Sequence, residues 1–202
     1  MAQAAIAVDP PSLRASADQR VFLRGVSWEG YESVLALRGE SSAVRISYLE
    51  GTLELMSPSQ DHELLKKMIA RLVEIYADEL GIPLEGYGSW TLKNPALERG
   101  AEPDECYSIG VAIGLPDLAI EVIWTHGGLD KLEIYRQLGV REVWVWKADE
   151  IQSFALRGDR YERIPASELL PQIDLGLIQS LLNAPSQTVA IRELRAALRS
   201  RS

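Results

Sequence analysis

Two acidic residues of this 202-residue chain, Glu121 and Asp104, could together do chemistry. Glu121 interrupts the apolar run 118–123, and Asp104 follows Pro103 in an earlier segment with strand character. A carboxylate inside an apolar strand, such as that of Glu121, is unfavourable unless it is paired or binds a metal ion. Carboxylate oxygens are the ligands that Mg²⁺ and Mn²⁺ prefer, and a bound divalent ion can activate water to hydrolyse a phosphodiester. If the fold brings the two residues together, they could form a metal-assisted hydrolytic site.

Asp117, which follows Pro116, is a rival for the first of these two positions. Asp117 and Glu121 share a strand face, but four residues of strand separate them by roughly 13 Å at about 3.3 Å each. One ion with bonds of about 2–2.5 Å cannot accept both carboxylates. We therefore expect Asp104 and Glu121 to be the metal ligands, and Asp117 to cap its strand or face solvent.

Hydrophobic periodicity and turn residues divide the chain into the elements that must position this pair. Apolar residues recur at helical spacing from residue 65 to residue 80, and Gly81 and Pro83 end that helix. The run 118–123 is apolar almost throughout, which is typical of a strand covered on both faces. Other helices are expected at residues 28–37, 129–138, 175–182 and 191–198, and other strands at 45–49, 52–56, 84–92, 101–107, 140–146, 151–156 and 160–164.

Between residues 60 and 147 the expected order is helix, three strands, helix and strand, as in the αβββαβ core of the PD-(D/E)XK nuclease superfamily. Several motifs carry a closer resemblance: residues 50–58 followed by His62, then Glu102-Pro103-Asp104, then 116–122, 131–135 and 139–144. In this order they resemble the signature of the Uma-two family of restriction-endonuclease-like proteins, over about residues 20–165.

This resemblance implies an α/β (α+β) fold: a restriction-endonuclease-like αβββαβ core whose mixed sheet is flanked by helices. An N-terminal helix and hairpin and a C-terminal hairpin and helices would complete it. We expect a flexible lead over residues 1–19, the nuclease-like domain over 20–165 and a C-terminal helical extension over 166–202.

The resemblance also implies an endonuclease that depends on Mg²⁺ or Mn²⁺ and acts on nucleic acid, with DNA as the expected substrate. It assigns catalytic roles to Asp104, Glu121 and Lys131. The superfamily carries a lysine two positions after the second acid, where this chain has Ile123. Lys131, near the start of the next helix, can reach back because its stem is long and flexible. The alternative is a solvated lysine that pairs with a neighbouring acid.

Supporting roles are expected for His62 and Glu63 at the start of the long helix. His62 can orient a water molecule or steady a carboxylate ligand, which is a common second layer of interactions around a metal. The alternative for a lone histidine at this place is helix capping or packing.

The charge of the chain argues against general affinity for DNA. The formal net charge is −8, whereas proteins that grip nucleic acid usually carry a basic surface. Four arginines near the C-terminus (Arg192, Arg195, Arg199 and Arg201) leave the rest of the chain still more acidic. A second hypothesis is therefore a catalytically silent binding module that keeps the nuclease fold.

Composition bounds the remaining possibilities. Cys106 is the only cysteine, so an intrachain disulfide is excluded and a reducing cytoplasm is the expected location. No apolar run approaches the roughly 20 residues that span a bilayer, so no membrane association is expected. No phosphate loop, nucleophile elbow or zinc motif supports another class of enzyme. Cutting both strands of DNA would favour a homodimer.

Overall fold

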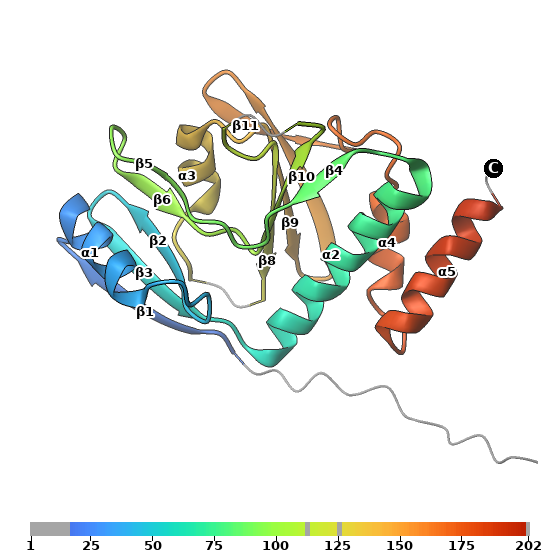
Figure 1. Cartoon of the computed structure of the whole chain (residues 1–202), viewed down its shortest axis with the longest axis horizontal. Helices are drawn as coiled ribbons and strands as arrows, with labels where there is room; N and C mark the ends of the chain where they lie inside the picture. The colour runs from blue at the N-terminus through green and yellow to red at the C-terminus, as the bar shows by residue number, and fades with distance from the viewer. Residues whose placement is uncertain (1–16, 112–113, 125–126, 201–202) are drawn as a thin grey trace, which may run out of the picture.

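The computed structural model describes residues 17–111, 114–124 and 127–200, which form two β-sheets and five α-helices (Figure 1). The first sheet is five-stranded and antiparallel, with the strand order β1-β3-β2-β6-β5. Its strands are β1 (Gln19–Arg24), β2 (Arg45–Leu49), β3 (Thr52–Ser57), β5 (Leu92–Asn94) and β6 (Arg99–Ala101). Helix α1 (Trp28–Arg38) packs on this sheet through the buried ring of Tyr31.

The second sheet is six-stranded, with the order β11-β10-β9-β8-β7-β4. Its strands are β4 (Leu84–Gly86), β7 (Glu105–Ile109), β8 (Leu118–Ile123), β9 (Glu142–Lys147), β10 (Glu150–Arg157) and β11 (Arg160–Ile164). Strands β8 and β9 are parallel and the other pairs are antiparallel. A parallel pair needs a crossover connection, and helix α3 (Lys131–Leu138) lies in the one that joins β8 to β9.

The two faces of the second sheet are covered differently. Side chains alternate along a strand, so Leu118, Ile120 and Val122 of β8 point to one face and join the core built on helix α2 (Gln60–Leu80). Ala119 points to the opposite face and packs with α3 and with β5 and β6 of the first sheet. Glu121 belongs to this second face, between the two sheets.

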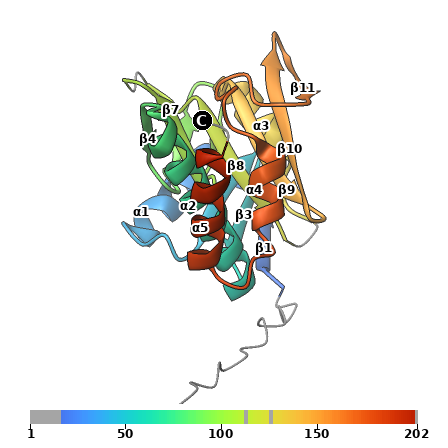
Figure 2. The same ribbon diagram turned by 90° about the vertical axis from the view of Figure 1, so that its right-hand side faces the viewer.

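Helices α4 (Leu175–Leu181) and α5 (Gln187–Arg199) pack with α2 on the far side of the second sheet (Figure 2). Leu194 and Leu198 of α5 are buried in the same core as α2 and β8. The segment 166–202, expected as a helical extension, thus supplies apolar side chains to the main core as far as it is described.

The starts of α2 and α3 are fixed by side chains that cap them. The Ser59 hydroxyl accepts a hydrogen bond from the backbone N–H of His62, and the Asp130 carboxylate accepts one from Glu133. Such caps satisfy N–H groups that lack a partner within the helix. Gly81 and Gly139 end the two helices in the left-handed conformation, at φ values of 65° and 78°. Local sequence therefore determines where His62 and Lys131 lie on their helices.

Two of the expected strands are wrong in their extent. Residues 84–92 form two short strands, β4 and β5, that belong to different sheets. Residues 101–107 likewise divide between β6 and β7, and Asp104 lies in the segment between them. Pro103 cannot donate a hydrogen bond to a strand ladder, which is consistent with the chain leaving one sheet and entering the other at this point.

The expected lead is only partly described, because residues 1–16 lie outside the described residues. Asp18 is buried and Gln19 begins β1, so the last residues of that segment belong to the folded domain. None of the helices in the described residues has the length and apolar character needed to cross a bilayer.

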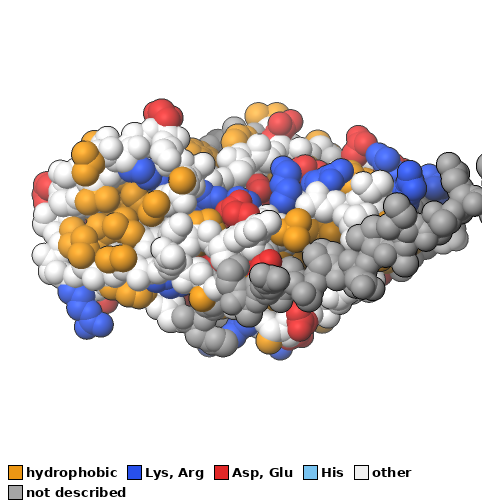
Figure 3. All heavy atoms as spheres, turned by 90° about the horizontal axis from the view of Figure 1, so that it is seen from below, with side chains coloured by type: hydrophobic (Ala, Val, Ile, Leu, Met, Phe, Trp, Pro, Cys, Tyr) orange, Lys and Arg blue, Asp and Glu red, His pale blue; other side chains and the backbone are white. Residues whose placement is uncertain are grey.

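The surface seen from below carries charges of both signs (Figure 3). Lys and Arg side chains stand beside Asp and Glu across the middle of this face, and hydrophobic side chains gather at the end of the molecule that carries α1 and β1. Exposed hydrophobic residues of these two elements include Val21, Leu23 and Leu37. This face is therefore not a continuous basic surface.

Candidate active site

Glu121 lies near the middle of β8, with only 5% of its surface exposed. Both of its carboxylate oxygens accept hydrogen bonds from the Lys131 ammonium, at 3.0 and 2.8 Å. The hydroxyl of Tyr135 donates to the same carboxylate. The acid in the apolar strand is thus paired, as its burial requires.

Lys131 and Tyr135 reach Glu121 from the same side of α3. They are four residues apart, so they lie one above the other on the helix surface. The Lys131 ammonium also donates to the backbone carbonyl of Glu102, at 3.1 Å. Lys131 thus reaches back from α3 to the strand that carries Glu121, and the two side chains are in direct contact.

Asp104 is fully buried and lies beside the same strand. Its Oδ2 accepts a hydrogen bond from the backbone N–H of Val122 at 2.8 Å, which holds the carboxylate next to Glu121 along β8. Its Oδ1 lies 3.0 Å from Nε2 of His62. The loop between β6 and β7 therefore carries Asp104 to the edge of the same site as Glu121.

His62 links Asp104 to a second buried carboxylate. Its Nδ1 lies 3.2 Å from Oδ2 of Asp18, and the other oxygen of Asp18 accepts from the backbone N–H of Ser59. The Asp18–His62–Asp104 chain is closed to solvent along its whole length. His62 is thus a positioning residue for Asp104.

Burial and charge set the protonation of these groups. Burial alone would lower the pKa of His62, but the hydrogen bonds to Asp104 and Asp18 outweigh it and raise the pKa to about 9. Burial likewise works to raise the pKa of Asp104, yet the hydrogen bond and charge of His62 hold it down at about 2. At neutral pH the histidine is therefore a cation that bridges two carboxylates.

Glu121 behaves differently from Asp104. Burial raises its pKa to about 7, against the opposing charge of Lys131 and with a contribution from the negative charge of Asp104. Burial would lower the pKa of Lys131, but the charges of Glu121 and Asp104 raise it. The Asp104 carboxylate is therefore ionised at neutral pH, whereas the Glu121 carboxylate has a pKa close to neutral pH. Such a contrast is common in catalytic sites.

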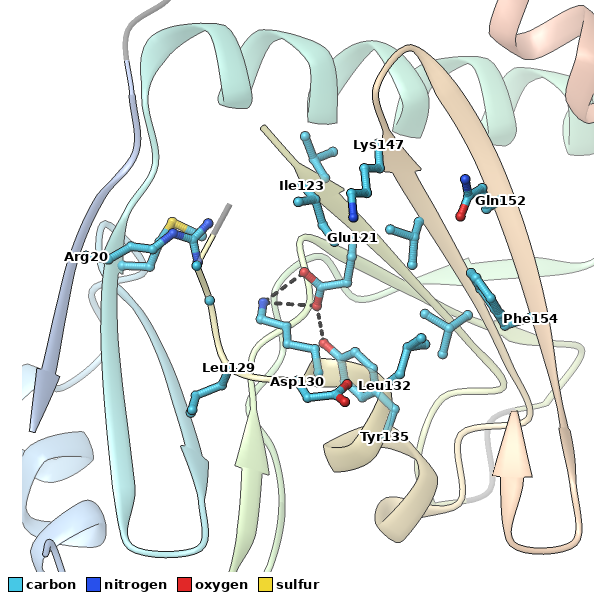
Figure 4. A pocket seen from close by; sticks show the side chains of 17 residues that line it. Arg20, Glu121, Ile123, Leu129, Asp130, Leu132, Tyr135, Lys147, Gln152 and Phe154 are labelled. Atoms are coloured by element: carbon cyan, nitrogen blue, oxygen red, sulfur yellow. Dashed lines mark hydrogen bonds and ion pairs between the residues drawn. The ribbon is translucent and has the colours of Figure 1, made fainter. Parts of the chain in front are cut away.

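The Glu121 carboxylate and the Lys131 stem line a pocket of about 310 Å³ between the two sheets. Figure 4 shows Glu121 at its centre, Tyr135 and Asp130 on the α3 side, and Phe154 and Gln152 on the β10 side. Arg20 enters from β1 on the opposite side. The pocket opens from the α3 face of the second sheet, so a ligand in it would meet Glu121 directly.

Arg20 is held in place by two buried acids. Its guanidinium pairs with Glu54 of β3 and with Asp18, and the second oxygen of Glu54 accepts from the backbone N–H of Leu129 at 2.8 Å. Glu54 thus fastens the segment before α3 to the first sheet. A Cβ on Gly128 would lie 2.5 Å from the Arg20 Nη1 atom, so this approach depends on glycine.

Glu63 does not join the site. It is half-exposed, and its carboxylate pairs with Lys66 at 2.7 Å and with Arg45 at 3.5 Å. One residue along a helix turns the side chain by about 100°, so His62 and Glu63 cannot face the same way. The expectation that Glu63 supports the metal ligands is thus not met by its position.

Asp117 lies apart from the site, as expected. Its carboxylate accepts from the backbone N–H of Ile109 at 2.9 Å and pairs with Arg141 at 2.8 Å. It fastens the start of β8 to its neighbours and leaves Asp104 as the acid beside Glu121.

Sequence reasoning missed Tyr135 and Asp18. The place of Tyr135 could have been predicted from the sequence, because a residue four positions after Lys131 lies on the same face of the helix. The place of Asp18 could not, since only the pairing of β1 with β3 brings the segment before β1 beside α2.

Comparison with known proteins places this geometry in a family. A family model described as "Putative restriction endonuclease", Uma2, matches residues 28–184. The chain belongs to the Uma2 family. The resemblance inferred from the motifs is therefore confirmed, and the matched range contains every predicted site residue. A search of the curated proteins found no match.

A solved structure shares the fold of this Uma2 protein. It is described as the crystal structure of "a putative nuclease belonging to DUF820" from Anabaena variabilis ATCC 29413. The two chains are 16% identical and superpose with a TM-score of 0.54, over 75% of this chain and 98% of the other. At this identity the likeness establishes the fold, which confirms the predicted restriction-endonuclease-like class.

Proposed function

We propose that this Uma2 protein is a metal-dependent endonuclease that hydrolyses phosphodiester bonds in nucleic acid, with DNA as the expected substrate. The observation that carries the proposal is the meeting of three groups from separate elements: Asp104 from the β6–β7 loop, Glu121 from β8 and Lys131 from α3. Membership of a family described as "Putative restriction endonuclease" supports the same reaction class.

The donor set suits Mg²⁺ or Mn²⁺. Among the described residues no group of three or more His, Cys, Asp or Glu side chains could hold a metal ion. Mg²⁺ is commonly held by one or two carboxylates, with water and substrate phosphate completing its coordination. Asp104 and Glu121 are two such carboxylates, and the mutual repulsion that helps raise the pKa of Glu121 is what a cation between them would relieve. A bound divalent ion would supply activation of water and neutralisation of the phosphate charge.

The residues of the chain have distinct roles in this proposal. Asp104, kept ionised by His62, is a permanent anionic ligand. Glu121 becomes a ligand when its proton is lost, and Lys131 and Tyr135 hold its carboxylate in one orientation. Lys131 also brings a positive charge to the place where negative charge grows during phosphodiester cleavage, which is the larger part of its expected contribution.

The decisive experiment is cleavage of supercoiled plasmid with Mg²⁺ or Mn²⁺. Asp104→Asn, Glu121→Gln and Lys131→Gln should each lower the rate by about 100-fold or more. Two matched controls lie outside the site: Asp117→Asn, which removes a carboxylate at the start of β8, and Lys67→Gln, which removes an exposed lysine of α2. Both should cleave at the wild-type rate after their thermal stability has been checked.

Equal cleavage by the wild type and Glu121→Gln would refute the catalytic assignment. A wild type that binds DNA without cutting it would favour the silent binding module instead. A homodimer stays the expected assembly for cutting both strands, and light scattering of the purified protein would measure its mass.

A further inference from the structure

Lys147 is the last residue of β9, and it stands beside the site without having been assigned a role. In the parallel pairing of β8 with β9, Lys147 is aligned with Ile123, and Val145 is aligned with Glu121. Paired residues of neighbouring strands point to the same face of a sheet. Lys147 and Glu121 therefore share the face that lines the pocket, and Figure 4 shows the Lys147 side chain directed toward Glu121.

The other two cations of this pocket have their charged groups engaged by protein. The Lys131 ammonium has three N–H donors, and it contacts three acceptors: both oxygens of Glu121 and the carbonyl of Glu102. The terminal nitrogens of Arg20 pair with Glu54 and Asp18. The Lys131 ammonium cannot bind a phosphate oxygen without giving up one of its partners, and the charge of the Arg20 guanidinium is already offset by two buried carboxylates.

The Lys147 ammonium differs from these two groups: within the described part of the chain it makes no hydrogen bond or ion pair. The acid aligned with it on β10 is Glu150, whose carboxylate is taken by Arg163 and by Gln152. The Lys147 side chain is exposed at the mouth of the pocket. Its three donors are thus available to a ligand.

A phosphodiester that approaches Glu121 and Asp104 meets negative charge, so the pocket needs a cation with free donors at its mouth. We propose that Lys147 is a substrate-binding residue of this site, and that its ammonium contacts a non-bridging oxygen of the phosphodiester chain. The proposal rests on the proposed function and adds the residue that receives the phosphate. It assigns phosphate binding to Lys147 and leaves Lys131 paired with Glu121.

Binding without cleavage tests this role separately from catalysis. A fluorescein-labelled DNA duplex is titrated with protein in Ca²⁺, and again in EDTA, and fluorescence anisotropy gives the Kd at several NaCl concentrations. Lys147→Gln should raise the Kd by about 10-fold and lower the slope of log Kd against log salt by about one. Lys147→Arg should keep the Kd within about threefold of the wild type, because it retains the charge.

Lys67→Gln is the matched control, since it removes an exposed lysine of α2 that does not line the pocket. The Kd of Lys67→Gln should stay within about twofold of the wild-type value, and its melting temperature should equal that of the wild type. If Lys147→Gln binds the duplex as tightly and with the same salt slope as Lys67→Gln, the proposal is overturned. Failure of the wild type to bind the duplex in either condition overturns it as well.

The outcome is separable from that of the cleavage assay. If the wild type binds but does not cut plasmid in Mg²⁺ or Mn²⁺, and Lys147→Gln still loses affinity, the proposed reaction fails while the phosphate contact stands. If the wild type cuts plasmid and Lys147→Gln binds normally, the reaction stands and the contact fails.

Discussion

The Lys131 ammonium lies 2.8 Å from one carboxylate oxygen of Glu121 and 3.0 Å from the other, in a site almost closed to solvent. Each charge stabilises the ionised form of the other, and either one alone would be a buried charge without a partner. The pair therefore contributes to the stability of the protein as well as to its proposed chemistry.

A double-mutant cycle should detect this coupling. Glu121→Gln leaves Lys131 without its anionic partner, and Lys131→Met forces Glu121 to take up a proton, so each should lower the free energy of unfolding by about 3–5 kcal/mol. The double variant should be less destabilised than the sum of the two by about 1–2 kcal/mol. Urea unfolding at pH 7 in EDTA measures all four proteins. Strict additivity would show that the two side chains do not interact.

The Asp18–His62–Asp104 chain should make stability depend on pH in a defined direction. The pKa of His62 is raised in the folded protein to about 9, from an ordinary value of 6.5, because its hydrogen bonds to Asp104 and Asp18 outweigh the effect of burial. Its contribution is therefore fully present below about pH 6.5 and is lost as the pH rises through about 9. The advantage of the wild type over His62→Gln should shrink by about 3 kcal/mol across this window.

Unfolding in EDTA at a series of pH values gives this difference, in which the titration of the other groups largely cancels. Asp18→Asn removes one of the two carboxylates and should flatten the curve in the same window. A difference between the wild type and His62→Gln that does not change with pH would contradict a cationic His62.

Tyr135 should shift the pH profile of cleavage through Glu121. Burial raises the pKa of Glu121 to about 7, and the Tyr135 hydroxyl opposes this by donating to the carboxylate. Protons compete with the metal, so at limiting Mg²⁺ the rate should rise as the pH passes through about 7. Tyr135→Phe should move this rise to higher pH, because the ionised carboxylate loses a hydrogen bond.

Plasmid cleavage between about pH 6 and pH 9, at low and at saturating Mg²⁺, measures the shift. Tyr161→Phe is a suitable control, since the Tyr161 hydroxyl donates to the Val140 carbonyl and does not line the pocket. An unchanged profile in Tyr135→Phe would mean that its hydroxyl does not influence the ionisation of Glu121.

The packing of α1 on the first sheet gives a prediction about stability alone. The Tyr31 hydroxyl is buried with no hydrogen-bond partner among the described residues, so Tyr31→Phe should be neutral or stabilising by up to about 1 kcal/mol. A Cβ on Gly100 would lie 2.6 Å from the Tyr31 Cζ atom, and the ring is stacked against Tyr48. Gly100→Ala should therefore destabilise by about 1–3 kcal/mol.

Thermal and urea unfolding of these two variants provide the check. Gly176→Ala serves as the control, because the added Cβ would meet only the Asp174 side chain, at 3.2 Å. Gly30→Ala is unsuitable, because its added Cβ would also be crowded. If Gly100→Ala were as stable as the wild type, α1 would have to move away from the sheet without cost.

Much of the framework could be predicted from local sequence. Apolar spacing and capping residues located the helices, and the near-continuous apolar run located β8 around Glu121. The prediction of one strand over residues 84–92 failed because apolar content does not say which sheet a segment joins. The structure places Asp104, and not Asp117, beside Glu121, but the position of Asp104 between β6 and β7 was not foreseen.

The sequence by itself thus determined much of the order of the elements, the acid Glu121 within an apolar strand, and a helix over residues 129–138 that carries Lys131. These features are local: they follow from side-chain periodicity, capping and the cost of burying charge. Only the tertiary structure decided that Asp18 closes on His62, that Lys131 faces Glu121 and that Lys147 stands beside Ile123. Those contacts depend on strand order, register and the crossover through α3, which bring together residues far apart in the chain and leave no trace in local spacing.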